Sequence, residues 1–246
     1  MTKLGRSTTI CWLFLGVLFL AGASRAQTRS PEVEQLAKTY GLDSYGQIEA
    51  VRYTFNLNLP ALKVNLSRTW TWEPKTGQVT YETKDKDGKP VKVTYNRSQL
   101  NSAPANVKDE IEPAFVNDNY WLIYPFHAYW DTSVNVTVKD KQKLPIGQGT
   151  AQLVSVKYPA EVGGYTPGDT WDLYVGKDGR IVQFVYHRGG PKKPSNVTTT
   201  WAGYKKGGPL LVSTDHRGTA DGKPARIFFT NVSVKLTGSD TWVDAQ

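Results

Sequence analysis

Cysteine is nearly absent from this sequence of 246 residues, in which Cys11 is the one example. Cys11 lies near the start of an apolar N-terminal run. Without that run, the chain can form no disulfide and offers no thiolate nucleophile and no cysteine-based zinc or iron–sulfur site. The fold must therefore be held together by a hydrophobic core.

Several enzyme signatures are missing as well. The sequence contains no G-x-S-x-G nucleophile elbow, no phosphate-binding P-loop and no dinucleotide fingerprint. Its three histidines are His127, His187 and His216, and none lies at metal-ligand spacing from another. His127 and Asp131 are four residues apart and could supply two ligands, short of a complete site. We expect no metal, no cofactor and no catalytic residue.

Carboxylate pairs for glycoside hydrolysis remain an alternative. Such a pair could be drawn from Asp109, Glu110, Glu112, Asp118 and Asp131. The first three fit better as the solvated face and first-turn acids of a short helix. A hydrolytic enzyme is therefore the weaker interpretation.

Residues 1–26 have the three parts of a cleavable export signal. Lys3 and Arg6 precede an apolar run of 14 residues, 10–23, and small residues at Ser24 and Ala26 suit a cleavage site. A membrane-spanning helix needs about 20 apolar residues. We predict cleavage after Ala26 and a single domain over residues 27–246 in the periplasm or outside the cell.

The charge that remains is mildly basic. Removing Lys3, Arg6 and Arg25 leaves 27 basic residues against 22 acidic ones, a formal charge of +5. No block of five like charges occurs, so nucleic-acid binding is not expected. A diffuse positive surface is compatible with transient contact with anionic membranes, although its simplest role is solubility. We expect a monomer.

The hydrophobic pattern predicts one N-terminal helix followed by many strands. Val33, Leu36, Ala37 and Tyr40 form one apolar stripe after a start at Ser30-Pro31. From Ile48 onward the period is two, and turns such as Asp87-Gly88 separate the strands. The pattern predicts about eleven antiparallel strands, at about 51–57, 62–72, 79–83, 91–95, 134–138, 151–158, 170–175, 180–186, 197–204, 209–215 and 225–236. The predicted class is mainly β (α+β), a strongly curved sheet or half-open barrel.

One segment, NDNYWLIYPFHAYWD at 117–131, has six aromatic residues among fifteen. It lies in a proline-broken insert at about 105–130, for which we predict two short helices, 106–112 and 117–124, with 126–130 leading back into a strand. A helix that is apolar on all sides must be covered on all sides. The segment is therefore either a permanent plug of the curved sheet or a lid over an apolar cavity.

Two parts of the sequence resemble a known superfamily. These are SRTWTWEPKTGQV, at the end of an early hairpin, and a back half that reads DTWDLYVGKDGRIVQFVYHRGG, TTTWAGYKKGGPLLVSTDHRG and IFFTNVSVKL. Together with the N-terminal helix they resemble the LolA/LolB-like superfamily over nearly all of residues 27–246. With WLIYPFHAYWD they resemble an uncharacterised group of LolA-like periplasmic proteins. The resemblance implies an eleven-stranded half-open barrel with a helical lid, a fold in which some members carry the acyl chains of lipoproteins.

The resemblance also suggests a role for Arg68. In the carrier proteins an arginine on an early strand holds the lid closed through contacts with the lid backbone, and Arg68 is the matching candidate. The simpler interpretation is a charge at the rim of the sheet with its stem on Trp70.

The expected function is non-catalytic binding of a hydrophobic small molecule, a lipid or a lipoprotein acyl chain under the lid. The expected cavity and lid residues are Phe55, Leu66, Trp70, Trp121, Tyr124, Phe126 and Trp171. The alternatives are a filled core without a ligand, and a carbohydrate-binding or hydrolytic envelope protein. Trp70 and Trp72 alternate with polar residues and should point inward, away from any sugar, whereas the direction of Trp201 is left open.

Overall fold

A computed structural model describes residues 29–161, 166–190 and 193–246. Its strands form one antiparallel sheet in the order β4-β3-β2-β1-β12-β11-β9-β8-β7-β6-β5, with β10 paired to β11 and β13 paired to β12. The predicted class is confirmed, because β4 and β5 remain as free edges and leave the barrel half-open. The predicted export signal lies outside the described residues.

The strands are as long as the period-two pattern indicates, and several extend further. Their bounds are β1 Ile48–Leu59, β2 Val64–Glu73, β3 Gln78–Lys84, β4 Pro90–Asn96, β5 Asn135–Lys143, β6 Thr150–Lys157, β7 Thr170–Val175, β8 Ile181–Arg188, β9 Ser195–Thr200, β10 Ala202–Gly207, β11 Leu210–Ala220, β12 Lys223–Leu236 and β13 Trp242–Asp244.

The described part of the chain has 13 strands where about eleven were predicted. The segment predicted as one strand at 197–204 is two strands, divided at Trp201, where the backbone N–H donates to the Val182 carbonyl. Gly203 follows with φ 65°, which a residue with a side chain rarely adopts. The other additional strand, β13, is a three-residue segment that no alternation marks.

Helix α1, Pro31–Thr39, forms as predicted and buries Val33, Leu36 and Ala37. Gly41 follows it with φ 108°, and a Cβ there would lie 2.4 Å from the Pro209 carbonyl oxygen. A 3-10 helix, η1 (Leu42–Gln47), then leads into β1.

The insert between β4 and β5 differs from the prediction. After the short helices η3 (Arg97–Ser102) and η4 (Val107–Ile111), a single helix α2 runs from Glu112 to Trp130. Pro113 is tolerated in its first turn, where no backbone donor is needed. The prediction that 126–130 leads into a strand was therefore wrong.

Pro125 bends α2 without ending it. Ile123 leaves helical geometry, with φ −123° and ψ 28°, as expected where a proline lacks its backbone donor and crowds the preceding turn. Phe126 beyond the bend is fully buried and contacts the rings of Tyr45 and Trp130 at 5.1 and 5.5 Å. Tertiary packing thus keeps the helix together across the proline.

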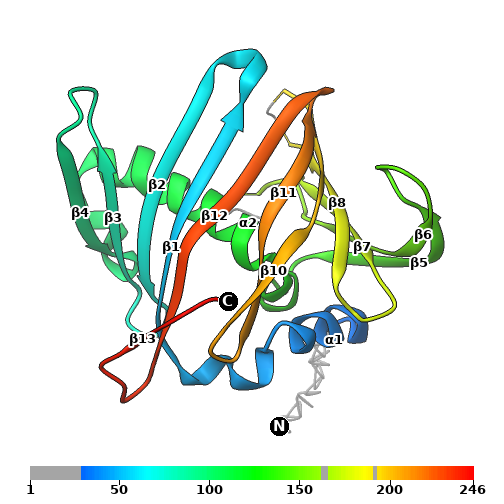
Figure 1. The fold of residues 1–246 in the computed structure, drawn as a ribbon, viewed down its shortest axis with the longest axis horizontal. Coiled ribbons are helices and arrows are strands. Elements are labelled where there is room, and N and C mark those ends of the chain that lie inside the picture. Colours follow the sequence, from blue (N-terminus) through cyan, green and yellow to red (C-terminus); the bar gives the residue numbers. More distant parts are fainter. Residues whose placement is uncertain (1–28, 162–165, 191–192) are drawn as a thin grey trace, which may run out of the picture.

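The sheet wraps around α2, which crosses behind β2, β1 and β12 in Figure 1. Phe115 of α2 contacts Trp70 of β2 at 5.4 Å, and Trp121 of α2 contacts Trp171 of β7 at 5.0 Å. The same helix therefore fills the space between strands far apart in the sheet order. Among the described residues, no helix is both long and apolar enough to cross a membrane.

Two histidines belong to this core. His216 of β11 is fully buried and stacks on Trp201 at 4.2 Å, and His127 of α2 stacks on Tyr120 at 3.8 Å. Burial lowers the pKa of each to about 3. Both rings are therefore neutral in the folded protein near neutral pH.

The buried histidines should make the fold sensitive to acid. The unfolded chain protonates them near pH 6.5 and the folded chain does not, so stability should fall as pH drops from about 6.5 toward 3. The loss is about 1.4 kcal/mol per pH unit for each histidine. Urea unfolding between pH 7 and 5 measures this loss of unfolding free energy. His216→Phe should reduce the dependence on pH by the contribution of one histidine.

His187 provides the matched control. Its side chain is 42% exposed and hydrogen-bonds Asp172, which raises its pKa. A raised pKa adds stability in acid, so His187→Asn should not flatten the slope. An unchanged slope in His216→Phe would contradict the assignment.

Candidate ligand-binding site

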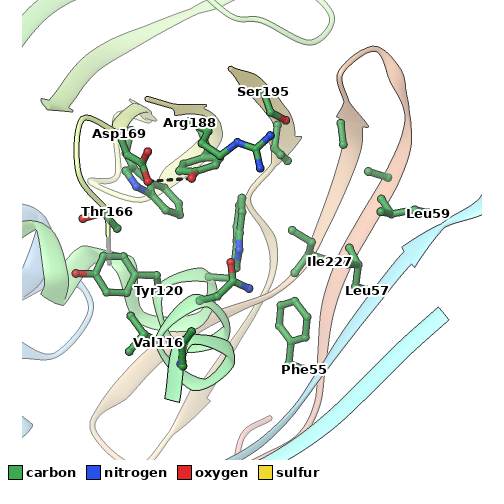
Figure 2. Close-up of a pocket in the computed structure, with 18 residues that line it drawn as sticks. Phe55, Leu57, Leu59, Val116, Tyr120, Thr166, Asp169, Arg188, Ser195 and Ile227 are labelled. Atoms are coloured by element: carbon green, nitrogen blue, oxygen red, sulfur yellow. Dashed lines mark hydrogen bonds between the residues drawn. The ribbon is translucent and has the colours of Figure 1, made fainter. Parts of the chain in front are cut away.

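A pocket of about 390 Å³ lies between α2 and the inner face of the sheet (Figure 2). Strands β1, β7, β8, β9, β11 and β12 contribute to it. Its lining consists of Phe55, Leu57, Leu59, Pro113, Val116, Asn117, Tyr120, Trp121, Thr166, Asp169, Trp171, Tyr186, Arg188, Ser195, Val197, Ala220, Ala225 and Ile227.

The sheet side of the pocket is apolar because of strand alternation. Phe55, Leu57 and Leu59 follow one another at period two on β1 and point to the same face. Leu57 pairs with Ile227 on β12, and Ala225 follows at the next inward position. The small side chain of Ala225 leaves space that a larger residue would fill.

Helix α2 supplies the opposite wall. Val116, Tyr120 and Trp121 are spaced at four and five residues and face the pocket. The Trp121 ring rests on Trp171, Phe184 and Tyr186, with centroid distances of 5.0, 5.0 and 5.8 Å. This aromatic cluster closes the pocket floor.

One end of the pocket is polar. Asp169 accepts hydrogen bonds from the Tyr186 hydroxyl at 2.9 Å and from the Gly189 backbone N–H at 2.8 Å. Gly189 and Gly168 touch backbone to backbone, since a Cβ on Gly189 would lie 1.9 Å from the Gly168 oxygen. Arg188 lies beside this group (Figure 2).

A buried ion pair ties the middle of α2 to β2. The Arg68 guanidinium donates to both Asp118 oxygens at 2.7 and 2.6 Å, and the Trp70 indole donates to Asp118 Oδ2 at 2.8 Å. The Asp118 side chain is 0% exposed. Burial raises the pKa of Asp118, and Arg68 opposes that shift. The guanidinium also lies 5.2 Å from the Phe55 ring.

Carboxylates at the two ends of α2, a buried one at the start and a half-buried one at the end, make similar contacts. At the start, Glu112 accepts from the Tyr95 hydroxyl at 2.6 Å and from Arg97 Nε at 2.9 Å. At the end, Asp131 accepts from the Tyr120 and Tyr158 hydroxyls at 2.9 and 2.8 Å. Tyr95, Arg97 and Tyr158 belong to or adjoin the sheet, so α2 is held along its length.

The predicted cavity residues divide into two groups. Phe55, Trp121 and Trp171 line the pocket. Trp70 is buried against Phe115, and Tyr124 is buried in a stack on Trp171 at 4.1 Å. Phe126 lies at the α1 side of the core and Leu66 lies opposite Leu57 in the β1–β2 pairing. These four lie outside the lining.

The predictions from the sequence did not include several residues that line the pocket. Leu57 and Leu59 continue the alternation of Phe55, a signal that would have identified them. Arg188 and Ser195 are paired in the β8–β9 hairpin, and Asp169 directly precedes β7, the strand on the other side of β8. The strand pattern alone did not show that these polar side chains line one end of a pocket.

His127 and Asp131, the two candidate metal ligands, form hydrogen bonds with other side chains. His127 Nε2 is 2.8 Å from Asn119 Oδ1, and Asp131 is held by two tyrosines. Within the described ranges, no three histidine, aspartate, glutamate or cysteine side chains gather as metal ligands.

The tryptophan platform for sugars also lacks support. Trp70 and Trp72 point inward as expected, and Trp201, whose direction was open, is buried against His216 and Phe184. Stacking on a sugar requires an exposed ring face. None of these three rings has one.

Comparison with solved structures finds seven matching chains, which include the following two. A DUF1329 family protein from Desulfovibrio piger covers 85% of this chain and 94% of its own, at 8% identity and a TM-score of 0.45. A LolA superfamily protein from Nitrosomonas europaea covers 82% of this chain and 93% of its own, at 6% identity and a TM-score of 0.47. No family model and no curated protein matches the sequence.

Removing one partner of the buried pair should be costly. Arg68→Met leaves the Asp118 carboxylate buried without its cation, so we expect a loss of about 3–5 kcal/mol in unfolding free energy. Urea denaturation measures this loss.

Two further variants make the test specific. Arg180→Gln breaks an exposed pair with Asp178 and should cause a much smaller loss, because solvent screens that pair. The double variant Arg68→Met/Asp118→Leu should recover part of the loss, because no charge remains buried. Equal effects of Arg68→Met and Arg180→Gln would show that the buried pair has no special weight.

Proposed function

We propose that the protein is an exported, periplasmic, non-catalytic binding protein that holds a lipid or a lipoprotein acyl chain beneath α2. The observation that carries the proposal is the pocket itself, which has apolar walls, one polar end and a volume of about 390 Å³. Pockets of about 300–1,000 Å³ with few polar groups are typical of small-molecule sites. Residues 1–26 would direct export.

The distribution of side chains favours a binding pocket over a completely filled core. Between β2 and the start of α2, large rings such as Trp70 and Phe115 pack together. Across the pocket, α2 instead faces Ala220, Val197 and Ala225. The small side chains lie where an apolar chain would be accommodated.

In this proposal α2 is the lid and Arg68 is its latch. The superfamily resemblance suggested contact between Arg68 and the backbone of the lid. The contact is with the Asp118 side chain, supported by the Trp70 indole. A charged pair of this kind weakens when water enters, because its attraction depends on the low dielectric of the closed state. Ligand exchange would proceed by displacement of α2.

Filling the pocket should weaken ligand binding. The protein, gently purified after export, should carry an apolar ligand detectable by native mass spectrometry. It should also bind a fluorescent fatty acid added to the solution. Ala225→Trp places a large ring in the pocket and should reduce the affinity at least about tenfold, the equivalent of 1.4 kcal/mol.

The matched control is Val182→Trp, an equally large change at an exposed position outside the pocket. It should leave binding unchanged. Absence of any bound ligand, together with failure of fatty acids to bind, would identify the pocket as unoccupied core and reject the proposal.

Weakening the latch should speed ligand exchange. Asp118→Asn keeps the shape of the side chain and removes its charge, so the hydrogen bonds from Arg68 lose about 1.5–3 kcal/mol. Stopped-flow measurement should show association and dissociation rates raised about tenfold or more. Glu34→Gln, which breaks the exposed pair with Lys38 on α1, is the control. Unchanged rates in Asp118→Asn would mean that ligand enters without movement of α2.

A further inference from the structure

Arg188 is the cation at the polar end of the pocket. It ends β8 and lies on the inner face with Tyr186 and Phe184, two and four residues earlier. Its Nε donates to the Lys193 carbonyl at 2.8 Å, which orients the guanidinium plane. Figure 2 shows the guanidinium directed toward the space beneath α2.

The guanidinium of Arg188 makes no ion pair with any carboxylate of the described residues. By contrast, five described arginines do have carboxylate partners: Arg68, Arg97, Arg180, Arg217 and Arg226. Arg188 is half-buried, and a partly desolvated cation gains most from a counter-charge at close range.

The nearby carboxylates are engaged by uncharged donors. Asp169 accepts from Tyr186 and from the Gly189 N–H. Asp221 accepts from the Ser195 hydroxyl at 2.9 Å and from the Asn196 N–H at 2.7 Å. Both acids keep their negative charge, and Arg188 helps to lower the pKa of Asp221, but neither carboxylate lies within ion-pair distance of the guanidinium.

We infer that Arg188 recognises an anionic head group, a carboxylate or a phosphate monoester, on the ligand whose chain occupies the pocket. The inference rests on the proposed function and names the chemical class of the ligand. A guanidinium binds two oxygens of such a group through parallel N–H donors. The apolar wall formed by Leu57, Leu59 and Ile227 then receives the chain.

The arrangement disfavours other head groups. A quaternary ammonium would be repelled by the guanidinium and could accept none of its hydrogen bonds. A hydroxyl head could accept one hydrogen bond and would gain no charge pairing.

Ligands with one chain and different heads test the inference. Hexadecanoate, hexadecyl phosphate, hexadecan-1-ol and hexadecyltrimethylammonium, each below its micelle concentration at pH 8, would compete with a fluorescent lipid probe on the mature protein. We expect at least one anion to bind about tenfold or more tightly than the alcohol, and the cation to bind most weakly. The two anions distinguish a carboxylate from a phosphate as the preferred head.

Arg188→Gln should bring the ratio of anion to alcohol affinity close to one, while Arg188→Lys should keep part of it, because the charge stays and the two-pronged geometry is lost. Arg180→Gln, which removes a positive charge outside the pocket lining, should keep the full ratio.

The outcomes separate the two proposals. Equal affinities for all four heads, or a ratio unaffected by Arg188→Gln, would overturn head-group recognition and leave chain binding intact. Failure of every chain to bind would overturn both.

Discussion

The seating of α2 depends on the ion pair between Arg68 and Asp118. The pair is bidentate, is joined by the Trp70 indole, and has its carboxylate fully removed from water. Two charges in such a place are stable only when each has its partner, so the pair specifies one position of α2 against β2. Apolar packing alone would hold so aromatic a helix in many orientations. The pair fixes the one in which Tyr120 and Trp121 reach the pocket.

The space under α2 is divided into two regions by side-chain size. Toward β2, Trp70 and Phe115 fill it. Toward β12, Ala225 and Ile227 leave a pocket whose other end is marked by Arg188. The carboxylates at the ends and in the middle of α2 all face hydroxyl, indole or guanidinium donors, and so the helix is held by directional contacts as well as by burial.

Much of the fold could be predicted because strand alternation is a local property. The β1 and β2 hairpin, the inward direction of Trp70 and the α1 stripe follow from the period of apolar residues. The course of 126–130 could not be predicted, because Pro125 argues locally for a break and the burial of Phe126 overrides it. The division at Trp201 was missed for a related reason, since it depends on pairing with two neighbouring strands.

The candidate site was predicted only in part, because local sequence patterns do not show tertiary contacts. Phe55, Trp121 and Trp171 could be found as inward aromatic residues. By itself the sequence determined a mainly β chain with a single cysteine and one aromatic helical insert, because composition and periodicity are properties of short segments. Only the tertiary structure decided that Asp118 is the partner of Arg68, that small residues of β11 and β12 leave a pocket, and that Arg188 faces it without a carboxylate partner. Those facts depend on distances between residues far apart in the chain, and such distances exist only once the sheet has curved around α2.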